Sequence, residues 1–206
     1  LDWGLRLTFL LAMPAAIALM VLSVPITATL FHYGRFDALS VDMTAQALIA
    51  YGVGLMGLIL VKILAPGFYA KQDISTPVKI GVGVLIATQL MNLIFVPWIA
   101  HAGLALSIGL GATLNAFFLF IMLRKNKIYQ PESGWSLFII QILGALFILA
   151  GSGLWMGSQF DWIALQAAPW TRIGLLLVIV LVSALGYFAA LMLMGLRITD
   201  FKRESA

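Results

Sequence analysis

The chain has 206 residues, of which 63% are hydrophobic and only 10% are charged, with a formal net charge of +4. A soluble domain carries about a quarter charged residues, so this composition excludes an ordinary soluble enzyme and predicts an integral membrane protein. The sequence has no cysteine, which excludes disulfides and thiolate metal sites, and its basic residues form no patch of the kind that binds nucleic acid.

The length fits about six helical spans with short loops, because each crossing of a bilayer core about 30 Å thick needs roughly 20 apolar residues. We therefore expect an all-α polytopic membrane helix bundle with six transmembrane helices. The expected spans are residues 7–31, 41–64, 77–99, 103–123, 135–157 and 170–196.

The first span contains Pro14 and Pro25, where we expect kinks. Its length and the lack of a small-residue cleavage pattern argue against a signal peptide. Because the sequence starts at Leu1, we expect a piece of a longer chain. Ser40 and Asp42 are typical of a helix start and predict the N-cap of the second span.

A compact basic turn joins the second and third spans. Pro66 and Gly67 are predicted to stop one helix, Lys71 and Lys79 lie in or near the turn, and Pro77 opens the next apolar run. Short loops rich in Lys and Arg are typical of the cytoplasmic side of a membrane, so we expect this turn to be cytoplasmic.

The distribution of the other basic residues between the two sides predicts the orientation. With six spans, one side holds Arg6, Lys71, Lys79, Arg124, Lys125, Lys127, Arg197, Lys202 and Arg203, and the other holds Arg35 and Arg172. The positive-inside rule then predicts that both termini are cytoplasmic.

Lys62 is the outstanding charged residue, because it lies inside the second apolar span. A lysine at the centre of a membrane helix costs roughly 2.5–3.5 kcal/mol on insertion scales, and such residues usually face a bundle interior or a wet cavity. One interpretation is a substrate-binding cation for an anionic group such as phosphate. The other is a side chain that extends to the headgroups from a position near the helix end.

Polar and small residues form stripes in the third and fourth spans. Helix association through close backbone contacts is the first interpretation of these stripes, and a polar cavity wall is the second. His32 and His101 lie in loops without a carboxylate or second histidine at ligand spacing, so we expect no metal site, and no motif indicates a cofactor. The stripes consist of Thr88, Gln89 and Asn92, and of Gly103, Ser107, Gly111 and Asn115.

Several segments resemble a known family. LDWGLRL, LFHYGRFD, APGFYAKQDISTPVKI and HAGLALSIGLGATLNAFFL are similar to the carboxy-terminal portion of the MurJ (MviN) family of lipid II flippases, which belongs to the multidrug/oligosaccharidyl-lipid/polysaccharide exporter superfamily. The resemblance covers essentially the whole chain, and the FYAKQDISTPVK turn is its most specific part.

The resemblance implies part of a transporter of the bacterial inner membrane that works by alternating access in cell wall biogenesis. Its partners would be lipid II (the undecaprenyl diphosphate-linked disaccharide peptide), membrane lipids and the missing amino-terminal part of the same protein. Residues 1–127 would be four helices of the carboxy-terminal lobe, and residues 128–206 two additional helices forming a groove for the lipid tail. Lys62 would line the central cavity.

The family's main substrate-binding arginines lie in helices absent from this chain, so the segment would not flip lipid alone. Some relatives bind sodium near the third and fourth spans; here the only candidates are Asn92 and Thr113, because these spans contain no Asp or Glu. Two alternatives stay open. The cargo could be a drug or another polyprenyl-linked saccharide, or the chain could be a structural membrane subunit in which Lys62 pairs with an acidic group of a partner helix.

Overall fold

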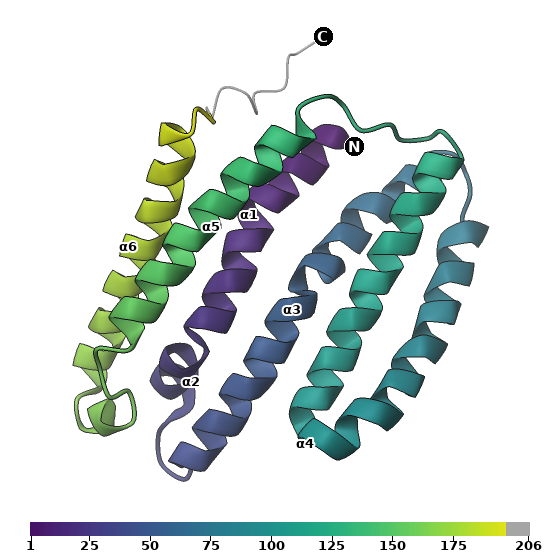
Figure 1. The fold of residues 1–206 in the computed structure, drawn as a ribbon. Coiled ribbons are helices and arrows are strands. Elements are labelled where there is room, and N and C mark those ends of the chain that lie inside the picture. The colour runs from purple at the N-terminus through teal and green to yellow at the C-terminus, as the bar shows by residue number, and fades with distance from the viewer. Residues whose placement is uncertain (197–206) are drawn as a thin grey trace. The chain divides into compact units, whose positions relative to one another are not determined.

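The computed structural model describes residues 1–196, and within them every regular element is helical, which confirms the predicted fold class. Figure 1 shows the order of these helices along the chain. They are α1 (Asp2–Val21), α2 (Ser23–Phe31), α3 (Ala38–Tyr69), α4 (Ser75–Lys125), α5 (Trp135–Gly157), the 3₁₀ turn η1 (Ala164–Ala167) and α6 (Pro169–Leu193).

Five of the described helices are long and apolar enough to cross a membrane. One of them, α4, has 51 residues, against roughly 20 for a single crossing. Its backbone leaves the helical region at Ile99 and Ala100, where the chain reverses direction (Figure 1). The two halves of α4 are therefore the predicted third and fourth spans, and the number of crossings is six.

The prolines of the first span behave differently from one another. Helix α1 continues through Pro14, whereas the helix is interrupted at Leu22, three residues before Pro25. Proline has no N–H to donate to the carbonyl four residues earlier, so Pro25 leaves the carbonyl of Val21 without its helical partner. A break is thus confirmed near Pro25.

The predicted end of the second span at Pro66 is wrong, because α3 continues to Tyr69. Packing explains the continuation: Phe68 is completely buried, and a Cβ atom on Gly67 would lie 3.0 Å from the side chain of Leu123. The turn itself comprises residues 70–74. Asp73 then begins α4 by accepting a hydrogen bond from the backbone N–H of Thr76 at 3.0 Å.

The predicted N-cap of the second span is also wrong. Helix α3 begins at Ala38, and Asp37 precedes it. The Asp37 carboxylate accepts hydrogen bonds from the backbone N–H and the hydroxyl of Ser40, at 2.9 and 2.7 Å. These bonds lower the pKa of Asp37, the hydroxyl contributing most. Asp37 therefore does what the sequence suggested for Ser40.

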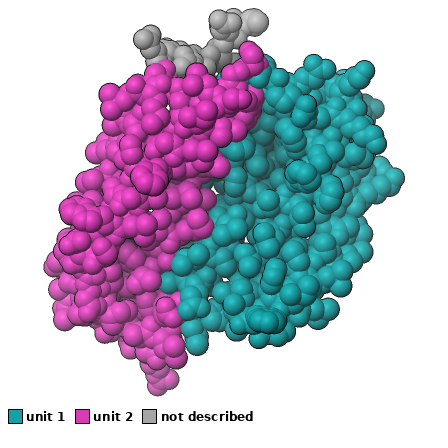
Figure 2. All heavy atoms as spheres, in the orientation of Figure 1, with its two compact units in different colours: residues 1–12, 43–132 teal, residues 13–42, 133–206 magenta. Residues whose placement is uncertain are grey.

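The chain divides into two compact units (Figure 2). Unit 1 consists of residues 1–12 and 43–132: the start of α1, most of α3 and both halves of α4. Close approach of backbones holds it together, since a Cβ atom on Gly54 would collide with the Cα of Gly109. Gly103 similarly packs against the backbone of Phe95, in the first half of α4.

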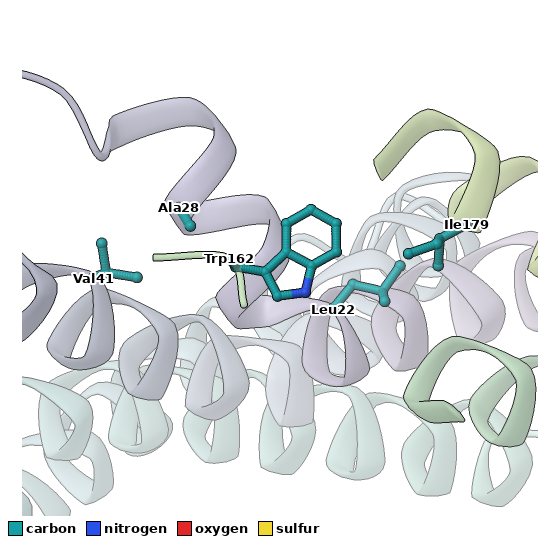
Figure 3. Close-up of a cluster of buried hydrophobic side chains, with 5 residues drawn as sticks. All are labelled: Leu22, Ala28, Val41, Trp162 and Ile179. Atoms are coloured by element: carbon teal, nitrogen blue, oxygen red, sulfur yellow. The ribbon is translucent and has the colours of Figure 1, made fainter. Parts of the chain in front are cut away.

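Unit 2 contains residues 13–42 and the described chain from Ser133 onward. Helices α5 and α6 lie side by side, joined by a hydrogen bond from the hydroxyl of Ser152 to that of Ser183 at 3.2 Å. Figure 3 shows the indole of Trp162 among the buried side chains at the core of this unit. These side chains are Leu22, Ala28, Val41, Trp162 and Ile179.

The last predicted span ends earlier than expected, because α6 stops at Leu193 rather than at residue 196. Three cations that entered the orientation prediction, Arg197, Lys202 and Arg203, lie outside the described residues. The predicted division at residue 127 remains a prediction about lobes of a larger protein.

Candidate functional site

Lys62 lies on the exposed side of α3, seven residues before the end of the helix at Tyr69. At 1.5 Å per residue this is about 10 Å from the end of the helix. The opposite side of α3 is the packed one, where Leu64 and Phe68 are buried. Lys62 therefore presents its ammonium group away from the core of unit 1.

The surroundings of Lys62 supply no negative charge. Among the described residues its side chain forms no hydrogen bond or ion pair, and the nearby carboxylate of Asp2 is paired with Arg6. Pro66 follows four residues later and has no N–H, so the backbone carbonyl of Lys62 also lacks its usual helical donor. The ammonium is thus available to an anionic group from outside the described chain.

The three polar residues in the first half of α4 separate into different environments. The Thr88 hydroxyl donates to the carbonyl of Val84 at 2.9 Å and lies against Gly111 in the second half of α4. Gln89 is exposed, and Asn92 donates to its side-chain oxygen at 3.5 Å. Thr88 therefore contributes to helix packing, while Gln89 and Asn92 form an amide pair beside it.

Two asparagine oxygens have no partner. Oδ1 of Asn92 and Oδ1 of Asn115 are buried, and neither accepts a hydrogen bond from any described residue. A buried amide oxygen without a donor is costly, so each is a site where a water molecule or a polar group of a ligand would be stabilised. Among the described residues of α4, these two amide oxygens are therefore the buried side-chain acceptors that still lack a donor.

The two sodium candidates are not adjacent. Contacts of Gly103 with Phe95 and of Gly111 with Thr88 place Asn92 approximately level with Ser107. Thr113 lies six residues further along, about 9 Å at the rise of an α-helix. Its hydroxyl donates to the carbonyl of Gly109 at 2.9 Å, beside Gly57. In the described structure the two residues do not form a common site.

Basic side chains gather at one end of unit 1. The start of α1, the turn after α3 and the end of α4 meet there (Figure 1), since a Cβ atom on Gly67 would lie 3.1 Å from Leu1 and 3.0 Å from Leu123. This convergence is what the predicted cytoplasmic orientation requires of unit 1. The cations on these segments are Arg6, Lys71, Lys79, Arg124, Lys125 and Lys127.

Unit 2 contains a buried arginine that the sequence marks only as a positive charge on the side opposite the basic loops. Arg172, in the first turn of α6, is completely buried. Its guanidinium donates to the backbone carbonyls of His32 at 3.3 Å and Trp162 at 3.4 Å, and lies 4.9 Å from the ring centre of Tyr33. Nη1, the nitrogen that donates to Trp162, also lies 3.4 Å from Nδ1 of His32. No local pattern connects these residues, because His32 and Arg172 are 140 positions apart.

Comparison with known proteins agrees with this architecture. Residues 1–172 match the family model described as lipid II flippase MurJ. The chain is 56% identical over its whole length to a lipid II flippase MurJ of Burkholderia cenocepacia, of which it covers 40%. It is 36% identical to a probable lipid II flippase MurJ of Haemophilus influenzae, with 96% of this chain and 38% of that protein covered.

A third relative is a probable lipid II flippase MurJ of Vibrio cholerae. The chain is 32% identical to it and covers 38% of its length. The chain thus spans about two fifths of the length of the curated relatives that it matches.

Proposed function

The chain belongs to the lipid II flippase MurJ family and is a multi-pass protein of the bacterial inner membrane, and from this we propose that it forms part of a lipid II flippase. In this proposal the flippase of which the chain is a part transports its substrate by alternating access during cell wall biogenesis and catalyses no covalent reaction. The observation that carries the proposal is the 56% identity to a lipid II flippase MurJ over the whole chain. The relatives' names favour neither another cargo nor a structural subunit.

Lys62 is the proposed contact for the anionic head of the lipid. Its exposure on α3 and the lack of a carboxylate partner among the described residues leave its charge uncompensated. A polyprenyl diphosphate carries the opposite charge, and an ammonium is a compact point charge suited to phosphate oxygens. The binding free energy would come from pairing two groups that are each costly to desolvate alone.

The polar residues of α4 are proposed as a wall near the sugar and peptide portion of the substrate. Asn92 and Asn115 each have a buried side-chain oxygen without a donor, and Gln89 is exposed beside Asn92. Amide groups of this kind can pair with the hydroxyl and amide groups of a disaccharide peptide. Thr88 supports the wall through its packing against Gly111.

Helices α5 and α6 are proposed to shelter the polyprenyl tail, as the two additional helices of residues 128–206. Their outward side chains are large and apolar, for example Phe147, Leu185 and Leu193, which are exposed. A long hydrocarbon chain can lie against such surfaces without burying polar groups. This assignment, like the cytoplasmic position of both termini, belongs to the proposal.

Replacement of Lys62 in the full-length protein tests the proposal directly. Lys62→Ala and Lys62→Glu should weaken binding of purified protein to lipid II, and the Glu variant should fail more severely in complementing loss of the flippase, because it repels the diphosphate. Lys62→Arg should retain part of the binding. Lys125→Ala is the matched control, since Lys125 is an exposed lysine at the end of α4 in the same unit.

Wild-type binding and complementation in both Lys62 variants would remove this residue from the mechanism. Equal binding of the wild-type protein to lipid II and to unrelated polyprenyl diphosphates would show that the cargo is broader than proposed.

A further inference from the structure

The buried cluster around Arg172 holds a full positive charge on neutral groups alone. Its neighbours are the backbone carbonyls of His32 and Trp162, Nδ1 of His32 and the face of the Tyr33 ring. The Nε atom of Arg172 has no partner among the described residues, and no carboxylate there forms an ion pair with the guanidinium. The cluster is therefore sensitive to any second positive charge.

His32 is the group that can supply this second charge. It is buried, and its Nδ1 can accept a hydrogen bond from the Arg172 guanidinium only while that nitrogen carries no proton. The contact therefore selects the neutral ring with its hydrogen on Nε2. If Nδ1 carried a proton, it and the guanidinium nitrogen would both be hydrogen-bond donors facing each other. The ring and the guanidinium would also both be positively charged, and their repulsion is weakly screened in a buried site.

The other charged groups near this corner are already occupied or exposed. On the chain after His32, Asp37 accepts two hydrogen bonds from Ser40, and Arg35 is exposed. In the loop before α6, Asp161 accepts from the backbone N–H groups of Ile163 and Ala164. Neither carboxylate forms a hydrogen bond or ion pair with the His32 ring or the guanidinium among the described residues. Asp37 is near enough for the charge of His32 to contribute to lowering the pKa of Asp37, so full neutralisation of a protonated His32 would require this carboxylate to move into contact with the ring.

The cluster connects three segments of unit 2, and these are the segments that could move if its contacts broke. Arg172 in α6 joins the end of α2, through His32, to the loop before α6, through the carbonyl of Trp162. The same Trp162 places its indole in the core of unit 2 (Figure 3). The indole N–H donates to the carbonyl of Gly157 at 2.8 Å. Release of Arg172 from His32 would therefore loosen the loop that covers this core.

We propose that His32 and Arg172 form a pH-sensitive latch, closed while His32 is neutral and opened by protonation of its ring. Histidine is the side chain whose charge ordinarily changes between about pH 5 and pH 8. With the orientation proposed above, the latch faces the periplasm and responds to acidification outside the cytoplasm. The latch itself depends only on contacts inside unit 2.

Cysteine accessibility in the full-length protein tests the latch, with any native cysteines replaced. One variant carries Ile163→Cys, at a position packed against the core, and another carries Gln159→Cys, at an exposed position in the same loop. The ratio of their labelling rates with a water-soluble thiol reagent cancels the general effect of pH on thiol reactivity. Lowering the pH from about 8 to about 5 should raise this ratio severalfold.

The response should disappear in His32→Gln, which cannot gain a proton, and in Arg172→Gln, which removes the opposing charge. His32→Asn is a second non-titrating variant in case glutamine disturbs folding. His101→Gln should respond like the wild type, because His101 is the other histidine of the chain and contacts the carbonyl of Met43 in unit 1. A constant ratio in the wild type, or a pH response that survives in both His32 variants, would overturn the proposal.

Discussion

The hydroxyl of Tyr129 donates a hydrogen bond of 2.5 Å to the Asp2 carboxylate and so ties the start of α1 to the segment that follows α4. Asp2 also accepts from Nε of Arg6 at 2.8 Å and from the backbone N–H of Glu132 at 3.4 Å. Burial and the hydrogen bond to Asp2 both raise the pKa of Tyr129. The phenol is therefore held protonated as a donor at the end of unit 1 where its basic residues gather.

Tyr129→Phe should destabilise the protein by about 1–3 kcal/mol, because a buried carboxylate loses a donor. The midpoint of thermal unfolding in detergent should fall accordingly. Tyr69→Phe is the matched control, since Tyr69 is exposed in the same unit and its loss of a hydroxyl should leave the midpoint nearly unchanged. Equal midpoints for the two variants would show that the Asp2 contact contributes little.

Gly54→Ala should destabilise unit 1 by about 1–3 kcal/mol, because the new methyl group collides with the Cα of Gly109 and the two helices must separate. Gly83→Ala is the control, for which we expect a change in unfolding free energy of the opposite sign. A Cβ atom at Gly83 meets nothing within 4 Å, so this substitution should stabilise the helix by up to about 1 kcal/mol. Thermal unfolding of the two variants measures the difference, and shifts of the same sign would contradict the close packing of α3 on α4.

Ala100→Gly should stabilise the protein by about 1 kcal/mol. Ala100 has a φ of 45° where α4 reverses, a conformation that side chains with a Cβ atom rarely adopt and that glycine adopts readily. Ala102→Gly, two residues later inside the helix, should instead cost about 1 kcal/mol. Unfolding midpoints again distinguish the two, and a loss of stability in both variants would refute strain at the reversal.

Acidification should weaken the first turn of α3 through Asp37. Its hydrogen bonds to Ser40 lower the pKa of Asp37 in the folded protein, so their contribution is present above the unfolded pKa of about 3.9 and is lost as the pH falls through the folded value. Hydrogen-exchange protection factors of residues 38–41 should therefore decrease below about pH 4 in the wild type. Asp37→Asn keeps a capping oxygen without titrating and should show no such decrease; an identical decrease would exclude Asp37 as the cause.

The sequence alone was sufficient for the fold class, for six crossings and for α5, whose bounds of Trp135 and Gly157 are those predicted. These features depend on local properties, namely the apolar length that a bilayer demands and the tryptophan at an interface. The family resemblance was readable for the same reason, since its segments are contiguous. Lys62 was also identifiable, because a lysine in an apolar span is locally anomalous.

The tertiary structure decided the features that depend on residues far apart in the chain. Packing of Phe68 and Gly67 carries α3 past Pro66, where a local rule predicted its end. Gly54 meets Gly109, and Arg172 meets His32 across 140 positions, with nothing in either neighbourhood to identify the partner. Local composition determines which segments enter the membrane. Which side chains contact one another depends on the free-energy cost of leaving a cavity between packed helices, or of leaving a buried charge without a partner.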